Sequence, residues 1–303
     1  MRGSLGWQAG EVFKELKAFG QSKFEFKQEF YKKSEDKSMQ NYGKEAGIYS
    51  YKTYDKYSAI ATDLLHFAKD NFGVKDILKL DNHAVNAYLQ SKLDKGLSRK
   101  TLSGYAGAVA KLETAINKYC VSHNLNQTYK FDTVQFREQV KELSYHHINR
   151  AYQDPEGIIN ALPGKYQLAA KLQFEGGMRV GEVGKLKAEN LIEGNTISVR
   201  GKGGKELIYT VPVETYKTLS QTLSNGGYFF TRSEGNRYRE ALNKASKETG
   251  QIYQGSHGFR YNAAQDNILE KLESGASLEE AKKDTSEMLG HNRLSITDHY
   301  TKF

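Results

Sequence analysis

Residues 196–211 read Thr-Ile-Ser-Val-Arg-Gly-Lys-Gly-Gly-Lys-Glu-Leu-Ile-Tyr-Thr-Val. The runs Thr196–Arg200 and Leu207–Val211 alternate apolar and polar residues, which is the period of a strand with one buried face. The glycine- and lysine-rich segment between them is typical of a turn. This stretch therefore predicts a β-hairpin.

Helical patterns lie on both sides of the hairpin. Apolar residues recur at intervals of three and four over residues 158–175, and a second amphipathic stretch, 179–187, follows the interruption at Gly176-Gly177. After the hairpin, helices are predicted over 241–249, 257–272 and 278–289, with a short piece over 294–300. The second half is thus predicted to be mainly helical, with one small hairpin inserted early.

The first half is predicted to be helical, and a length of 303 residues favours two domains. Helical spacing covers 53–71, 82–95 and 98–119, whereas the segment from Tyr145 to Gly157 has turn residues and no periodicity. We expect a mainly α fold of the α+β class, divided into an N-terminal helical arm (1–45), a helical bundle (46–145), a linker (146–157) and the hairpin-bearing domain (158–303).

The charge of the chain favours a polyanionic partner. Lysine and arginine number 44 against 36 acidic residues, a net charge of +8 with a pI near 9.1. Residues 1–150 hold 24 basic and 17 acidic side chains, so nearly all of the excess lies in the first half. Nucleic acid is the leading candidate partner, ahead of an anionic membrane surface.

Cysteine usage and hydropathy exclude several classes of protein. Cys120 is the only cysteine, which excludes an internal disulfide and any multi-cysteine metal site, and we expect it to be a buried helix residue. No apolar run approaches the length of a membrane span, and the N-terminus lacks the pattern of a secretory signal. We therefore expect a cytoplasmic protein without a membrane partner.

Arg99 and Lys100 are candidate DNA-binding residues. Ser98 precedes them and is a suitable N-cap, so both side chains are expected in a first helical turn whose free N–H groups favour phosphate. The alternative is that both side chains are merely solvated.

Six residues of the second half are candidate catalytic residues. Each has an ordinary explanation of its own, for example a surface pairing of Arg179 with Glu182, or a solvated turn lysine at 202. They occur in the motifs Gly-Gly-Met-Arg-Val-Gly-Glu, Arg-Gly-Lys-Gly-Gly-Lys, His-Gly-Phe-Arg and Leu-Gly-His-Asn-Arg, followed by a final tyrosine, and are Arg179, Lys202, His257, Arg260, His291 and Tyr300.

Attack on a phosphodiester needs these residue types jointly. Negative charge builds up on the non-bridging oxygens, and two guanidiniums offer them paired donors. A tyrosine hydroxyl, with a pKa of about 10, is a poor nucleophile at neutral pH unless a base or a cationic pocket assists it. Clustered arginine, histidine and lysine side chains provide that setting.

In this order, the motifs resemble the catalytic signature of the tyrosine recombinase or phage integrase family, which includes the Xer recombinases. The resemblance is strong in the second half and only general in the helical bundle. It implies that the bundle binds the DNA core site and that residues 158–303 form the catalytic domain. It also implies that the enzyme cuts and rejoins DNA strands at specific sites.

The resemblance also implies a role for each candidate residue. Tyr300 attacks the phosphate and forms a 3′-phosphotyrosyl link, and Arg179 and Arg260 hold the non-bridging oxygens. Lys202 protonates the leaving 5′-oxygen, His257 handles the tyrosine proton and His291 hydrogen-bonds the phosphate. Glu182 supports the first arginine.

No metal or other cofactor is expected, because the phosphotyrosine retains the energy of the cut bond. The expected partner is a double-stranded recombination site, bound as four protomers on two duplexes. The sequence ends three residues after Tyr300, whereas many family members continue into a helix that packs on a neighbouring subunit, so the mode of subunit contact stays open.

Three other functions remain open from the sequence. A type IB topoisomerase shares the phosphotyrosine chemistry but rejoins the same strand. The chain could also be a catalytically inactive DNA-binding accessory protein, or a helical scaffold that is basic only for solubility. Integration, excision and chromosome dimer resolution are not distinguished.

Overall fold

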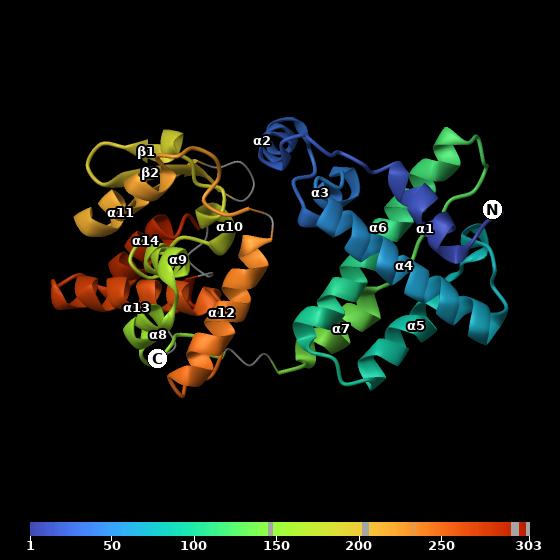
Figure 1. Cartoon of the computed structure of the whole chain (residues 1–303). Helices are drawn as coiled ribbons and strands as arrows, with labels where there is room; N and C mark the ends of the chain where they lie inside the picture. Colours follow the sequence, from blue (N-terminus) through green and yellow to red (C-terminus); the bar gives the residue numbers. More distant parts are fainter. Residues whose placement is uncertain (145–147, 202–205, 232, 292–296, 301–303) are drawn as a thin grey trace. The chain divides into compact units, whose positions relative to one another are not determined.

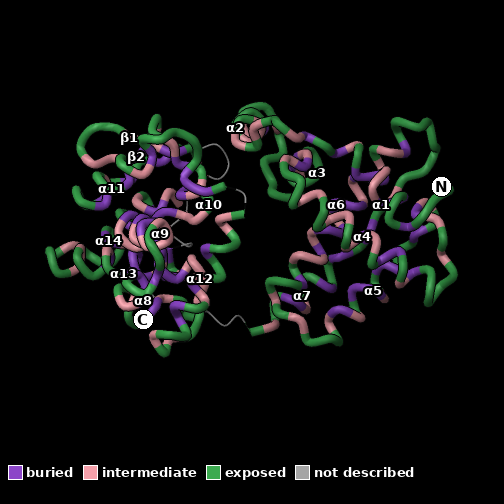
Figure 2. The backbone as a smooth tube through the Cα atoms, in the orientation of Figure 1, coloured by how far each residue is buried: buried purple, intermediate pink, exposed green. Residues whose placement is uncertain are grey.

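The computed structural model describes residues 1–144, 148–201, 206–231, 233–291 and 297–300. The chain divides into two compact units, Met1–His146 and His147–Phe303. In each unit the buried residues gather inside and the exposed residues cover the outer face of the elements (Figure 2).

The described part of unit 1 is helical (Figure 1). Its three longest helices, α4, α5 and α6, correspond to the three helical patterns of the sequence. The elements are α1 (Leu5–Lys14), α2 (Lys23–Lys33), α3 (Met39–Glu45), α4 (Tyr51–Phe72), the 3-10 helix η1 (Ile77–Lys79), α5 (Asn82–Asp94), α6 (Arg99–Ser122) and α7 (Val134–Glu142).

Serine caps set the starts of many of these helices. The Ser98 hydroxyl accepts the backbone N–H of Thr101, so the predicted N-cap of α6 is confirmed. The same arrangement begins α1, α2, α3 and α4, at Ser4, Ser22, Ser38 and Ser50.

Helix α1 packs into the main core of unit 1. Val12 and Phe13 are fully buried against α4 and α6, although they lie in the segment predicted as an arm. Cys120 is buried on α6, as expected. Helices α2 and α3 enclose a separate small aromatic cluster around Phe30 and Tyr42.

Unit 2 combines helices with a small sheet, so the predicted fold class is confirmed. Its helices are α8 (Pro155–Ala161), α9 (Gly164–Phe174), α10 (Val180–Val183), the 3-10 helix η2 (Ala188–Asn190), α11 (Val213–Leu223), α12 (Glu234–Glu248), α13 (His257–Glu273) and α14 (Leu278–Met288). Its strands are β1 (Leu191–Ile192), β2 (Thr196–Arg200) and β3 (Glu206–Thr210).

The predicted hairpin forms, and its second strand begins at Glu206, one residue before the predicted run. Strands β2 and β3 are antiparallel, with Arg200 opposite Glu206 and Ile197 opposite Tyr209. Ile197, Val199, Leu207 and Tyr209 are buried on the inner face, as the alternation requires. The sequence reading missed β1, which adds a third strand beside β2.

Three predicted helices differ from the observed ones, and helix α11 was not predicted. The helix predicted over 241–249 begins seven residues earlier, as α12. The pattern over 158–175 forms two helices, α8 and α9, because Pro163 removes a backbone donor and disfavours a helical conformation for Leu162. The stretch 179–187 contains only the single turn α10, after which the chain turns at Gly184 toward η2.

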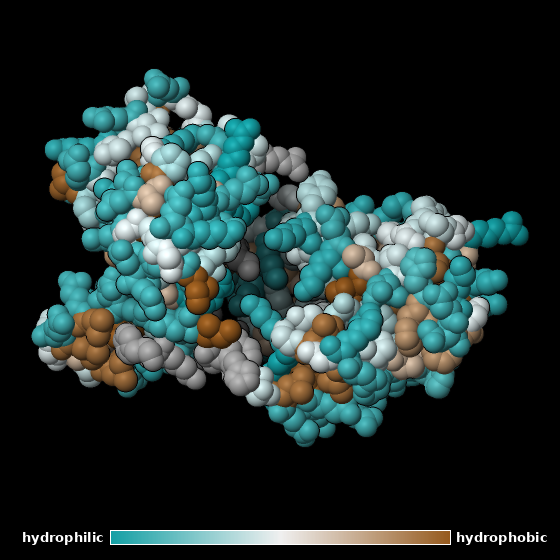
Figure 3. Space-filling model, turned by 60° about the horizontal axis from the view of Figure 1, so that its bottom comes forward, coloured by the Kyte–Doolittle hydropathy of each residue, from teal (hydrophilic) through white to brown (hydrophobic). Residues whose placement is uncertain are grey.

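Helix α13 packs against α9 and α14 in unit 2. Its buried residues include Phe259, Arg260, Ala264 and Ile268. The space-filling view is mainly hydrophilic, with hydrophobic residues in small separate groups (Figure 3). None of the described helices is long and apolar enough to cross a membrane.

Candidate active site

The Glu182 carboxylate holds Arg179 at the start of α10. It accepts hydrogen bonds from the backbone N–H of Arg179 at 2.8 Å and from its Nη1 at 2.8 Å. Tyr209 on β3 donates its hydroxyl to the same carboxylate at 2.9 Å. Burial and the adjacent Glu182 raise the pKa of Tyr209 to about 12, so its phenol stays a donor. Arg179 is thus fixed from two elements.

Arg260, on α13, is fully buried and donates to two backbone carbonyls. Its Nη1 donates to Gly177 O and its Nη2 donates to Leu289 O. Arg179 Nη2 also donates to Leu289 O, at 3.4 Å. One carbonyl oxygen therefore accepts from both guanidiniums, which brings the two arginines together around a single oxygen.

Gly177 has the conformation that this arrangement requires. Its φ of +65° lies in the left-handed region, which side-chain-bearing residues adopt only with strain. A Cβ at this position would lie 2.9 Å from Leu289 Cδ2, which is too close for unchanged packing. Glycine is therefore required where the chain presents its carbonyl to Arg260.

His291 is neutral in this setting. Burial, followed by the nearby Arg260 and Arg179, lowers the pKa of His291 from 6.5 to about 3. Its Nε2 lies 3.2 Å from Arg260 Nη2, which can only donate, so Nε2 is the acceptor and the proton lies on Nδ1. A buried Nδ1–H donor results.

Two buried donors in this cluster lack a partner among the described residues: Arg260 Nε and His291 Nδ1. Within the same residues, no carboxylate lies at ion-pair distance from the Arg260 guanidinium. A buried cation with unused donors is costly unless an anion compensates it. The cluster is therefore suited to bind an anion.

Tyr300 lies beside this cluster and is only 4% exposed. Its hydroxyl is 3.4 Å from His257 Nε2. Its ring stacks on His291 at a centroid distance of 5.7 Å and contacts Tyr261 at 4.5 Å. The phenol thus has a potential proton acceptor and cationic neighbours within one site.

The structure brings five of the six catalytic candidates together: Arg179, His257, Arg260, His291 and Tyr300. Glu182 lies directly behind Arg179. Lys202 lies outside the described residues.

Arg99 and Lys100, the candidate DNA-binding residues, are in the first turn of α6 in unit 1. Arg99 Nη1 donates to Leu143 O at 3.4 Å, and Lys100 is exposed.

The sequence reading missed Tyr209 and the two carbonyls. The alternation of β3 places Tyr209 on the inner face of the hairpin, so the sequence pattern could have identified it. The carbonyls of Gly177 and Leu289 could not be identified in this way, because every residue type carries a backbone carbonyl. A groove of about 220 Å³ between α10 and the start of α12 was also missed. Exposed Lys185 and Arg239 contribute cationic side chains to it.

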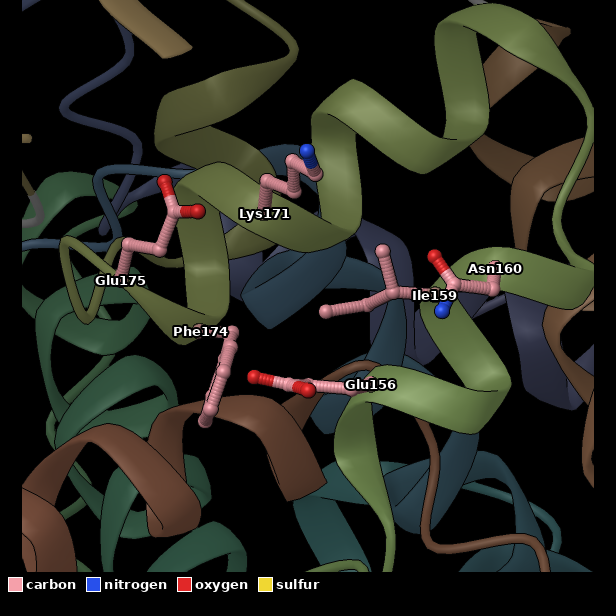
Figure 4. A pocket seen from close by; sticks show the side chains of 6 residues that line it. All are labelled: Glu156, Ile159, Asn160, Lys171, Phe174 and Glu175. Atoms are coloured by element: carbon pink, nitrogen blue, oxygen red, sulfur yellow. The ribbon is translucent and has the colours of Figure 1, made fainter. Parts of the chain in front are cut away.

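A separate cavity of about 190 Å³ lies between α8 and α9 (Figure 4). Its side chains are Glu156, Ile159, Asn160, Lys171, Phe174 and Glu175. None of them belongs to the cluster around Arg260, so this cavity is distinct from the candidate active site.

Comparison with known proteins identifies the family. The model of the phage integrase family matches residues 138–303, more than half of the chain. The chain therefore belongs to the phage integrase family. As a member, it is a tyrosine-type site-specific recombinase, an enzyme that transfers DNA strands.

Two curated relatives illustrate the similarity. Integrase of Escherichia phage P2 is 28% identical over 146 residues, which are 48% of this chain and 40% of that protein. The match therefore spans less than half of the phage protein. Tyrosine recombinase XerC of Pediococcus pentosaceus is 25% identical over 282 residues, 84% of this chain and 88% of that protein.

Two solved structures share the fold. The post-cleavage complex of XerH site-specific recombinase with a palindromic difH substrate has a TM-score of 0.63 at 18% identity, covering 99% of this chain and 91% of that one. A lambda integrase dimer bound to a COC′ core site has a TM-score of 0.55 at 14% identity, covering 86% and 92%.

Proposed function

We propose that this recombinase cuts and rejoins double-stranded DNA through a covalent link between Tyr300 and a 3′ phosphate. The observation that carries the proposal is a pair of buried donors, Arg260 Nε and His291 Nδ1, which have no partner among the described residues and lie beside a tyrosine hydroxyl. A phosphodiester supplies both the missing negative charge and the missing acceptors.

In the proposed cutting step, the Tyr300 oxygen bonds to phosphorus as the bond from phosphorus to the 5′-oxygen breaks. The phenol proton passes to His257 Nε2, which lies 3.4 Å away. Lys202, carried over from the family motif, protonates the departing 5′-oxygen. Rejoining is the reverse, with a 5′-hydroxyl attacking the phosphotyrosine, so no metal or other cofactor takes part.

The two arginines stabilise charge on the non-bridging oxygens. A phosphate oxygen takes the place of Leu289 O as the acceptor shared by the two guanidiniums. His291 keeps its Nδ1 proton at neutral pH and donates it to the phosphate without adding a charge. Glu182 keeps Arg179 oriented throughout.

DNA is the proposed partner of both units. The related XerH and lambda integrase structures are complexes with DNA. We assign phosphate contacts to Arg99 and Lys100 on α6 and to the groove with Lys185 and Arg239. By family resemblance, four protomers assemble on two duplexes in the cytoplasm.

The test is covalent capture on a library of nicked duplexes. Wild type is expected to form a denaturation-resistant adduct with DNA, and Tyr300→Phe is expected to form none, because the attacking oxygen is missing. Tyr253→Phe, which removes a partly exposed hydroxyl in the same unit, serves as the matched control and is expected to form the adduct. Sequencing the captured DNA gives the target site.

Other outcomes separate the rival functions. DNA binding with no adduct on any duplex would mean an inactive accessory protein. Relaxation of a supercoiled plasmid that lacks the captured site, without strand exchange, would favour a topoisomerase.

A further inference from the structure

Gln265 connects the nucleophile to the segment through which the chain enters unit 2. This side chain is 8% exposed and lies on α13, the helix that carries His257 and Arg260. Its Nε2 donates to Tyr300 O at 3.1 Å and to Asn149 Oδ1 at 3.2 Å. One amide group thus bridges the first and the last described segments of unit 2.

The partners fix which way the Gln265 amide faces. A backbone carbonyl can only accept, so Tyr300 O requires the nitrogen of Gln265. Asn149 Oδ1 also accepts the backbone N–H of Ala151 at 3.0 Å, which identifies that atom as the amide oxygen of Asn149. Both contacts therefore need the two hydrogens of one NH₂ group.

A second amide on α13 fixes the same entering segment. Asn262, one turn before Gln265, accepts the backbone N–H of Tyr152 at 2.9 Å and donates to Tyr152 O at 2.8 Å. Gly258, a further turn back along the same helix, lies so close to Tyr152 that a Cβ there would be 2.5 Å from its ring. The segment Asn149–Tyr152 is therefore held against the helix of the active site.

We propose that Gln265 is a positioning residue that couples the entering segment Asn149–Tyr152 to the main chain of Tyr300. The inference rests on the proposed function, since it assumes that Tyr300 is the nucleophile. Gln265 does not touch the reacting atoms. It holds the Tyr300 backbone so that the phenol stays beside His257, and it makes that position depend on where Asn149 lies.

The test compares single-turnover cleavage with DNA affinity in four variants. Gln265→Met removes both hydrogen bonds with little change in volume. Asn149→Ala removes the bond from Gln265 to the entering segment, together with the contact between Asn149 Oδ1 and the Ala151 N–H. Asn149→Asp keeps the acceptor oxygen and is the conservative rescue. The fourth variant combines Gln265→Met with Asn149→Ala. Wild type and Tyr300→Phe are measured alongside.

Cleavage at saturating DNA is expected to fall about three- to tenfold in Gln265→Met, because the bond to Tyr300 O, which holds the nucleophile, is worth about one hydrogen bond at the transition state. The cleavage rate is expected to fall less in Asn149→Ala and to stay at the wild-type value in Asn149→Asp. The double variant is expected to cleave at the same rate as Gln265→Met. DNA affinity is expected to stay unchanged in all four, which also shows that they fold.

The coupling would be overturned if the fold-loss of cleavage in the double variant equalled the product of the two single losses. Wild-type cleavage in both Asn149→Ala and Gln265→Met would also overturn it. If Gln265→Met did not fold, the surface variants Asn149→Ala and Asn149→Asp would decide, since the coupling predicts a loss of cleavage in the first and none in the second, and wild-type cleavage in both would overturn it. Failure of wild type to form any adduct would instead reject the proposed function, so the two failures are distinguishable.

Discussion

His291 links the chemistry of the site to the stability of the fold. Its pKa of about 3 lies below the ordinary value of 6.5, so the native chain keeps the imidazole neutral where the unfolded chain protonates it. As pH falls from 6.5 toward 3, the unfolded state therefore binds a proton that the native state does not, and stability is lost. Above pH 6.5 this effect is absent.

Between pH 6.5 and pH 4, the melting temperature of His291→Gln is expected to fall less than that of wild type, because glutamine stays neutral in both the native and the unfolded state. Thermal unfolding followed by circular dichroism at several pH values measures it. His66→Gln, which replaces an exposed histidine on α4, is the control and should follow wild type. Parallel curves for His291→Gln and wild type would contradict the lowered pKa.

At the same scale, the sequence predicted most of the site through residue type and spacing. His257 and Arg260 are three positions apart and share α13, so their proximity follows from helix geometry. The acceptors Gly177 O and Leu289 O were not predictable, because every residue has a carbonyl and only the folded backbone decides which ones face Arg260.

Among the elements, the turn at Gly177 between α9 and α10 is constrained both by its backbone conformation and by its packing. Gly177→Ala is expected to lower the free energy of unfolding by about 1–3 kcal/mol, from the left-handed φ together with the contact with Leu289. Urea unfolding measures the change.

The matched control is Gly181→Ala, four residues further along the chain. Gly181 lies in α10 without a positive φ, and a Cβ added there would have no atom within 4 Å, so alanine is expected to be neutral or slightly stabilising. Equal effects of the two substitutions would show that a side chain does not strain the backbone at 177.

Periodicity predicted the elements that have enough residues to show a period. The alternation of 196–200 and 207–211 predicted β2 and β3, and helical spacing predicted α13 and α14 within two residues. Strand β1 has two residues, too few to show any alternation. Pro163 indicated the break between α8 and α9, but apolar residues at helical spacing on both sides of it favoured a single helix.

For the whole molecule, the net charge of +8 predicts DNA affinity that falls steeply with salt. If the groove between α10 and α12 contacts two phosphates, replacing Lys185 and Arg239 by alanine should reduce the slope of log affinity against log salt by about 2. Fluorescence anisotropy at several salt concentrations measures this slope.

The control for the groove replaces two lysines of the same unit, Lys271 and Lys282, by alanine. Each already pairs with a carboxylate, Asp284 at 3.4 Å and Asp298 at 2.9 Å. The control double variant should therefore keep the wild-type slope. Equal losses in both double variants would indicate a general charge effect and would remove the groove from the proposed DNA interface.

The oxygen that accepts from both arginines belongs to the main chain at Leu289. An acceptor of this kind is supplied by any amino acid, so mutational drift at position 289 cannot delete it in the way that it could delete a carboxylate. The evolutionary constraint falls instead on Gly177 and Gly290, whose positive φ values shape the backbone on the two sides of the contact. The Leu289 side chain is itself fully buried in a cluster with Ala264 and Tyr300, so a saturation library of this region should tolerate apolar replacements at 289 better than any replacement of these two glycines.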